Sequence, residues 1–255
     1  MEETMEHTAL RRQPMEVIEF GKQNRDTVML LHGGGLSWWN YRDVAEILSE
    51  TFHVILPVLD GHGGSDEGFT SIEDNAARMI SYIDVHCGGQ VAVLGGLSLG
   101  GQIVLEMLAQ RPGICRSALI ESALVKPSKL TQALIGPMFA MSYGLIKQQW
   151  FARWQASYLG IPGALFADYY RDTCAISQED LIAFTKANCG YTLKPLETTA
   201  GVKIVAGSRE QRNILESAKM IRRAIPGSEL TILPGLKHGD LSLNYPEWYV
   251  RMLEI

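Results

Sequence analysis

The stretch Gly96-Leu97-Ser98-Leu99-Gly100 constrains this chain more than any other. It follows an apolar run, Val91 to Leu94, and precedes a helical pattern that continues through Leu108. A serine in this setting lies on a sharp turn between a strand and a helix, and the helix points its free N–H groups and positive end towards it. The flanking glycines let strand and helix pack closely. Such a Gly-x-Ser-x-Gly turn is typical of a nucleophile, so Ser98 is the first candidate catalytic residue.

Apolar runs alternate with helical patterns along most of the chain. This alternation predicts an α/β fold with a mostly parallel central sheet and helices on both faces. The predicted strands cover residues 15–20, 27–31, 52–56, 90–95, 117–120, 202–206 and 229–233, the first of them an edge strand. Helices are predicted over about 40–50, 71–86 and 211–224, after the Ser98 turn and from 246 onwards. Ser71, with Asp74 three residues on, is the expected N-cap of the second.

The composition changes between residues 122 and 196. Methionine and aromatic residues cluster there, prolines interrupt the stretch, and the periodicity predicts about four helices. We therefore expect an α/β core at 15–121 and 197–255, a helical insertion at 122–196 between strands six and seven, and a tail at 1–14. The insertion should lie over the carboxyl ends of the strands, where open α/β sheets bind ligands.

Composition and charge exclude several classes of function. A net charge of −5 without a basic run argues against nucleic-acid binding and against an anionic membrane surface. The first residues lack the apolar segment of a signal peptide, and no apolar run is long enough to span a membrane, so we expect a cytoplasmic protein. No phosphate-binding P-loop or dinucleotide motif occurs. We expect no cofactor and no metal, a small-molecule substrate as the partner, and leave a homodimer open.

A serine nucleophile needs a base to take its proton and an acid to orient that base. His238 follows the last predicted strand, and Glu210 follows the strand before it. Both loops should leave the carboxyl edge of the sheet, where Ser98 also lies. Two backbone N–H groups should hold the developing oxyanion, one from Leu99 and one from Gly34 in the loop after residues 27–31.

Several of these residues have alternative roles. Glu210 could be simply an acidic residue at a helix N-terminus, where it is favoured anyway. Glu121, at the end of an earlier strand, is the alternative acid. Trp38 and Trp39 flank the oxyanion loop, and either could wall the pocket or pack against a helix. His32 is expected to support the backbone of its loop.

These motifs together resemble the α/β-hydrolase fold family, over nearly the whole chain from about residue 15. The residues that carry the resemblance are 32–35, 60–66, 96–101, Gly207 with Glu210, and His238. The resemblance implies a triad of Ser98, Glu210 and His238, an oxyanion hole at Gly34 and Leu99, and a helical cap at 122–196. The family more often has aspartate at the acid position, where this chain has Glu210.

The expected function is a carboxylesterase-like serine hydrolase that cleaves a small to medium, largely apolar ester, thioester or lactone through an acyl-enzyme. Residues 32–42 are similar to meta-cleavage product hydrolases, which cut carbon–carbon bonds and use a cap arginine. Arg153 and Arg171 are the candidates for that arginine, but Gly239 stands where those enzymes have tryptophan. A third alternative is a ligand-binding protein on the same fold without turnover.

Overall fold

A single sheet of seven strands forms the centre of the computed structural model, which describes residues 15–253. The strands are β1 (Val17–Phe20), β2 (Thr27–Leu31), β3 (His53–Pro57), β4 (Val91–Leu97), β5 (Cys115–Glu121), β6 (Gly201–Gly207) and β7 (Glu229–Leu233). They lie in the order β1-β3-β2-β4-β5-β6-β7, and only β1 is antiparallel to its neighbour. The predicted mostly parallel α/β fold is therefore confirmed, whereas the predicted tail at 1–14 lies outside the described residues.

The burial of each strand explains its place in the sheet. All seven residues of β4 are buried, as its continuous apolar sequence predicts for a strand covered on both faces. The edge strand β1 is only partly buried along its length. The register pairs Leu31 with Gly96 and Leu97 with Glu121. The carboxyl ends of β2, β4 and β5 therefore meet at one edge, directly before Ser98.

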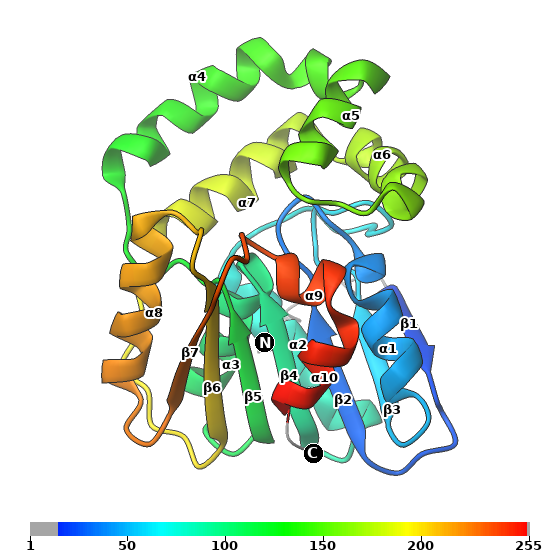
Figure 1. Ribbon diagram of the computed structural model, residues 1–255, viewed down its shortest axis with the longest axis vertical. Coiled ribbons are helices and arrows are strands. Elements are labelled where there is room, and N and C mark those ends of the chain that lie inside the picture. The colour runs from blue at the N-terminus through cyan, green and yellow to red at the C-terminus, as the bar shows by residue number, and fades with distance from the viewer. Residues whose placement is uncertain (1–14, 254–255) are drawn as a thin grey trace, which may run out of the picture.

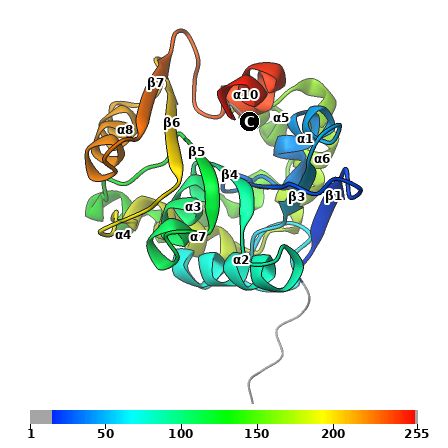
Figure 2. The same ribbon diagram turned by 90° about the horizontal axis from the view of Figure 1, so that it is seen from below.

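Helices cover both faces of the sheet (Figure 2). The helices α2 (Ile72–His86), α3 (Leu99–Gln110) and α8 (Arg212–Ala224) contribute to one apolar core. The helices α1 (Arg42–Leu48), α9 (Asp240–Asn244) and α10 (Pro246–Leu253) contribute to the other, with the 3-10 turn Trp38–Tyr41. The Ser71 hydroxyl accepts a hydrogen bond from Asp74 N–H at 2.9 Å, which confirms the predicted N-cap of α2. Among residues 15–253, no helix combines the length and apolarity needed to cross a membrane.

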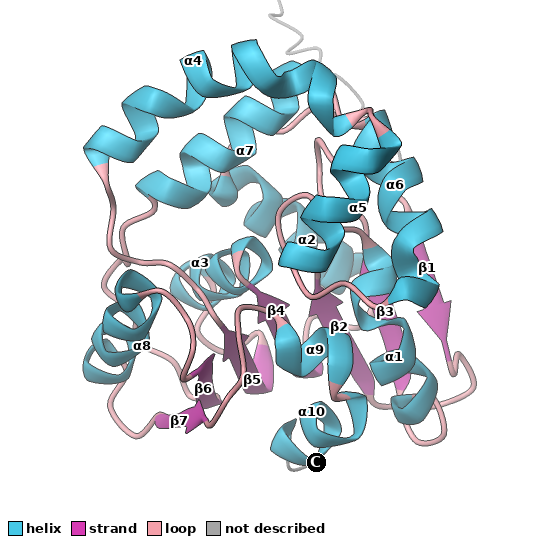
Figure 3. Ribbon diagram, turned by 45° about the horizontal axis from the view of Figure 1, so that its top comes forward, coloured by secondary structure: helices cyan, strands magenta, loops and turns pink. Residues whose placement is uncertain are grey.

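Four α-helices form an insertion over the carboxyl ends of the strands (Figure 1). They are α4 (Lys129–Ile146), α5 (Gln149–Tyr158), α6 (Phe166–Ala175) and α7 (Gln178–Gly190), with a 3-10 turn at Gly163–Leu165. Figure 3 shows α4 and α7 running side by side, with α5 and α6 beyond them. The insertion lies between β5 and β6, so its predicted place between strands six and seven was wrong. Among the described residues, five strands precede it, and the predicted strand ranges also put five before residue 122, so the error lay in the numbering.

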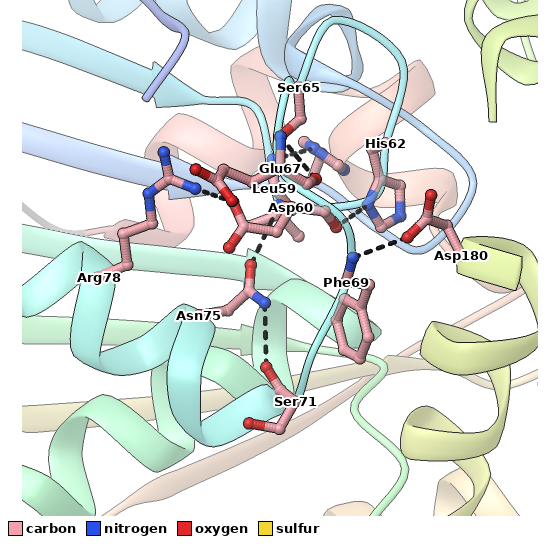
Figure 4. A network of polar contacts seen from close by, with 11 residues as sticks. Leu59, Asp60, His62, Ser65, Glu67, Phe69, Ser71, Asn75, Arg78 and Asp180 are labelled. Carbon is pink, nitrogen blue, oxygen red and sulfur yellow. Dashed lines mark hydrogen bonds and ion pairs between the residues drawn. The ribbon is translucent and has the colours of Figure 1, made fainter. Parts of the chain in front are cut away.

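A polar network fastens the loop after β3 to its surroundings (Figure 4). Asp60 pairs with Arg78 of α2, and its backbone N–H donates to Asn75 Oδ1 at 3.1 Å. Further along the loop, Phe69 N–H donates to Asp180 Oδ1 of α7 at 2.7 Å. This last bond joins the insertion to the core. The loop is therefore held by α2 on one side and by α7 on the other.

Candidate active site

Ser98 lies on a strained turn between β4 and α3. Its φ of 53° and ψ of −109° are rare for a residue with a side chain and cost about 1–3 kcal/mol. A Cβ atom on Gly96 would overlap the backbone of Gly100, and one on Gly100 would overlap the carbonyl of Leu31. The predicted close approach of strand and helix is thus confirmed. Ser98 N–H donates to the carbonyl of Glu121 at 2.8 Å, which anchors the turn to β5.

His238 and Glu210 form a close pair beside this turn. The Nδ1 atom of His238 lies 2.8 Å from Oε2 of Glu210. The Glu210 side chain is fully buried, whereas that of His238 is 43% exposed. The two residues come from the loops that follow β7 and β6, at the same end of the sheet as Ser98. The acid is thus shielded from water while the imidazole faces solvent.

Hydrogen bonds keep the Glu210 carboxylate charged in its buried place. Burial alone would raise the pKa of Glu210, but the bond and charge of His238, together with Ser122 and Gly207, lower it below its ordinary value. An ionised carboxylate only accepts hydrogen bonds, so it holds His238 with the proton on Nδ1. That tautomer leaves Nε2 with a free lone pair, as a general base requires.

Ser122 supports the Glu210 carboxylate, and no sequence motif pointed to it. Its hydroxyl donates to Oε1 of Glu210 at 2.5 Å, and Gly207 N–H donates to the same atom at 3.0 Å. Ser122 follows β5 directly and has a φ of 57°. A single serine after a strand carries no distinctive pattern, and its partner lies 88 positions away. These bonds also seat the longer side chain of a glutamate in this position.

Glu121 is bonded to a different partner. Its Oε1 atom accepts from Ser242 N–H at 3.4 Å, and no described residue hydrogen-bonds Oε2. The side chain is 2% exposed, and burial raises its pKa to about 7. Ser242 in turn accepts a bond from Asn40 Nδ2 at 3.3 Å, and Asn40 Oδ1 accepts from Gly33 N–H at 3.2 Å. Glu121 therefore joins a buried network that reaches Gly33 in the loop after β2.

The backbone of Gly34 lies close to the start of α3. A Cβ atom built on Gly34 would be 3.6 Å from a methyl group of Leu99 and 3.5 Å from the ring of Phe184 in α7. Within the described chain, nothing accepts a hydrogen bond from Gly34 N–H. Leu99 is the first residue of α3, so helical geometry leaves its N–H without an intrahelical partner. Within the described residues, both N–H groups therefore lack a hydrogen-bond partner, as the predicted oxyanion hole requires.

His32, Trp39 and Trp38 each contact other residues of the fold. His32 Nε2 accepts from Leu59 N–H at 3.1 Å, so the prediction that His32 supports main chain is confirmed. Trp39 is buried and donates from Nε1 to Asp172 of α6 at 2.8 Å. Trp38 lies under the guanidinium of Arg42. Neither tryptophan is among the residues that line the two cavities at Ser98.

Ser98 and His238 both line two adjoining cavities. The larger, about 580 Å³, also reaches Glu210, the beginning of α8 and the ends of α5 and α7. Its apolar wall consists of Leu124, Tyr158, Leu159, Cys189 and Ile214. The smaller, about 60 Å³, includes Gly33 and Gly34. Within residues 15–253 no three His, Cys, Asp or Glu side chains are grouped to hold a metal ion.

The two arginines of the insertion have partners away from these cavities. Arg171 forms ion pairs with Asp168 at 2.9 Å and with Asp172 at 2.7 Å. The guanidinium of Arg153 lies 4.4 Å from the centre of the Phe166 ring. Neither arginine lines a cavity at Ser98. The carboxylate-binding role that a carbon–carbon hydrolase would give to one of them therefore has no support in this arrangement.

Comparison with known proteins agrees with this architecture. The model of the Alpha/beta hydrolase family matches residues 28–252. The chain belongs to this family. A pimeloyl-[acyl-carrier protein] methyl ester esterase of Neisseria meningitidis serogroup C is 27% identical to this α/β hydrolase over 230 residues, which are 83% of this chain and 86% of that protein.

Two further proteins resemble this chain, one in sequence and one in structure. An AB hydrolase superfamily protein of Gibberella zeae is 29% identical over 131 residues, 50% of this chain and 45% of that protein, so the match spans less than half of that relative. The crystal structure of the enol-lactonase from Burkholderia xenovorans superposes on this α/β hydrolase with a TM-score of 0.76 at 16% identity, covering 94% of this chain and 96% of that one. At that identity the superposition establishes the shared fold.

Proposed function

We propose that this α/β hydrolase is a serine carboxylesterase. The observation that carries the proposal is the pairing of His238 Nδ1 with the buried Glu210 carboxylate, at the edge of a cavity that also exposes Ser98. A serine on a strained strand–helix turn, a histidine in the right tautomer and an ionised acid are the components of acyl transfer. The related methyl ester esterase, matched over most of both chains, supports an ester as the substrate.

The proposed reaction has two halves. Ser98 Oγ attacks the ester carbonyl carbon while His238 Nε2 takes its proton, and the tetrahedral oxyanion accepts hydrogen bonds from Leu99 and Gly34 N–H. The alcohol then leaves with the proton from His238 and an acyl-enzyme remains. Water, deprotonated by His238, attacks the acyl carbon, the acid departs, and Ser98 regains its proton. Glu210 keeps its charge throughout and stabilises the imidazolium.

Short-chain p-nitrophenyl esters and a fluorophosphonate probe test this proposal. The wild-type protein should hydrolyse p-nitrophenyl acetate and butyrate, and peptide mass spectrometry should find the probe on Ser98. Ser98→Ala and His238→Ala should each lower kcat about 10⁵–10⁶-fold. Ser81→Ala, an exposed serine of α2 away from the site, is the matched control and should retain activity.

The same experiment has a clear contrary outcome. A folded wild-type protein that turns over no ester of the panel and takes up no probe at Ser98 would refute the esterase proposal. A ligand that raised the Tm of that inactive protein would then favour the binding-protein alternative.

A further inference from the structure

Two cations line the larger cavity, and each directly precedes a residue of the proposed acid–base pair. Arg209 comes before Glu210 and Lys237 comes before His238, and both line the cavity of about 580 Å³ that exposes Ser98. The two loops are joined, because Arg209 N–H donates to the carbonyl of Leu236 at 2.9 Å. Both positive charges therefore belong to neighbouring loops at one side of the cavity.

The acidic residues nearby are bonded to other groups. Among residues 15–253, Glu210 is the only acidic residue lining this cavity, and its oxygens accept hydrogen bonds from His238, Ser122 and Gly207. The Asp240 carboxylate accepts from the backbone N–H of Lys237 at 2.7 Å. In the described part of the chain, no carboxylate forms an ion pair with the side chain of Arg209 or Lys237.

Two cations outside the cavity lining differ from Arg209 and Lys237 in having acidic partners. Arg212 and Lys126 both pair with Glu216, at 2.8 Å and 2.6 Å. The chain as a whole has 28 acidic against 23 basic residues. The lining of this cavity holds these two cations against one carboxylate, that of Glu210, which gives it a net positive charge and a local positive field. Such a field attracts an anion and raises its local concentration.

We propose that the larger cavity selects esters that carry a carboxylate remote from the scissile bond, with Arg209 and Lys237 as its binding groups. This inference rests on the proposed esterase function and names its substrate class. The planar guanidinium fork of arginine suits a carboxylate, and the lysine ammonium adds a mobile point charge. Leu124, Leu159 and Ile214 on the cavity wall would contact a methylene spacer between the two ends of the substrate. Monoesters of aliphatic dicarboxylic acids fit this description.

Monomethyl adipate and methyl hexanoate form a matched pair for the test, because a carboxylate in the first replaces the terminal methyl group of the second. The wild-type kcat/KM should be about tenfold higher for monomethyl adipate, chiefly through KM, and the preference should shrink in about 0.5 M NaCl. Monomethyl esters from succinate to suberate should show one preferred spacer length.

Charge variants then assign the preference to the two side chains. In Arg209→Gln with Lys237→Gln the ratio of the two kcat/KM values should fall about tenfold, and in Arg209→Glu with Lys237→Glu it should invert. Arg212→Gln is the control, because it removes an exposed cation of α8 that lies outside the cavity lining. Its ratio should equal that of the wild type.

A binding measurement keeps this proposal separate from the esterase proposal. The adipate dianion should raise the Tm of wild type and of Ser98→Ala, and should have no effect on the double glutamine variant. Ester turnover without a carboxylate preference, or a preference that survives in the double variant, would overturn the anion site and leave the esterase intact. Absent turnover with intact adipate binding would overturn the esterase alone.

Discussion

Glu121 should make the stability of this protein fall as the pH rises. Its side chain is 2% exposed, Ser242 N–H donates to one oxygen at 3.4 Å, and the other oxygen has no hydrogen-bond partner in the described chain. Burial raises its pKa from 4.5 to about 7. A pKa raised by folding means that the folded state holds the proton more tightly than the unfolded state. The stabilisation is therefore complete below about pH 4.5 and is lost as the pH rises to about 7.

The size of the effect follows from the shift. Each pKa unit corresponds to about 1.4 kcal/mol, so a shift from 4.5 to about 7 gives about 3 kcal/mol in total. Between pH 5 and pH 8 the wild type should lose about 2.5 kcal/mol that Glu121→Gln does not lose. The glutamine keeps an acceptor for Ser242 N–H but has no charge to desolvate. The two proteins should therefore differ in the slope of stability against pH.

Urea unfolding, followed at several pH values between about 5 and 8, measures this difference. The free energy of unfolding of wild type minus that of Glu121→Gln should fall between pH 5 and about 7 and level off above that. Glu106→Gln is the control, because it removes an equally buried carboxylate that is paired with Lys194 at 2.6 Å. That variant should be destabilised throughout the interval. Parallel curves for wild type and Glu121→Gln would refute the argument that an isolated buried charge costs the protein stability.

Three further predictions concern the site itself. Ser98→Gly and Ser98→Ala should both be inactive, but urea unfolding should find the glycine variant more stable by about 1 kcal/mol, because glycine adopts a φ of 53° without strain. Glu210→Gln should lower kcat for p-nitrophenyl butyrate about 10³–10⁴-fold, since an amide can favour the wrong tautomer of His238; unchanged kcat would exclude Glu210 as the acid. Asn40→Ala should lower kcat about tenfold at similar KM, because it releases Gly33 N–H in the oxyanion loop; a change confined to KM would contradict this role.

The parts of this fold that the sequence predicted are those set by local patterns. Continuous apolar runs marked the buried strands, and the Ser71 side chain marked the beginning of α2, as its bond to Asp74 N–H confirms. The five-residue helix α9 was missed because it is too short to show a helical period. The place of the insertion was misnumbered by one strand, although the predicted strand ranges already put five strands before residue 122, as the structure does.

In the candidate site, too, local patterns could be predicted from the sequence and long-range contacts could not. Ser98, Glu210 and His238 could be chosen from motifs and chain order because each follows a strand at one edge of the sheet. Chain order favoured Glu210 as the acid but left Glu121 as the alternative, because which of the two side chains turns towards the histidine depends on packing. Ser122 gave no signal for the same reason. Contacts across 28 and 88 positions arise from packing and leave no pattern in a single sequence.

The proposed substrate preference would be set by two parts of the fold. The insertion supplies apolar wall through Tyr158, Leu159 and Cys189, whereas the proposed anion-binding side chains, Arg209 and Lys237, come from the core loops. Each cation directly precedes the acid or the base, so moving its backbone also moves the catalytic geometry, and a misplacement of about 1 Å can cost 100-fold in rate. The wall residues of the insertion do not adjoin the acid or the base in the chain. Substitutions in the insertion should therefore be able to change the preferred spacer length of the substrate. A change in the preferred substrate charge requires replacing the side chains of Arg209 and Lys237 without moving their loop backbone.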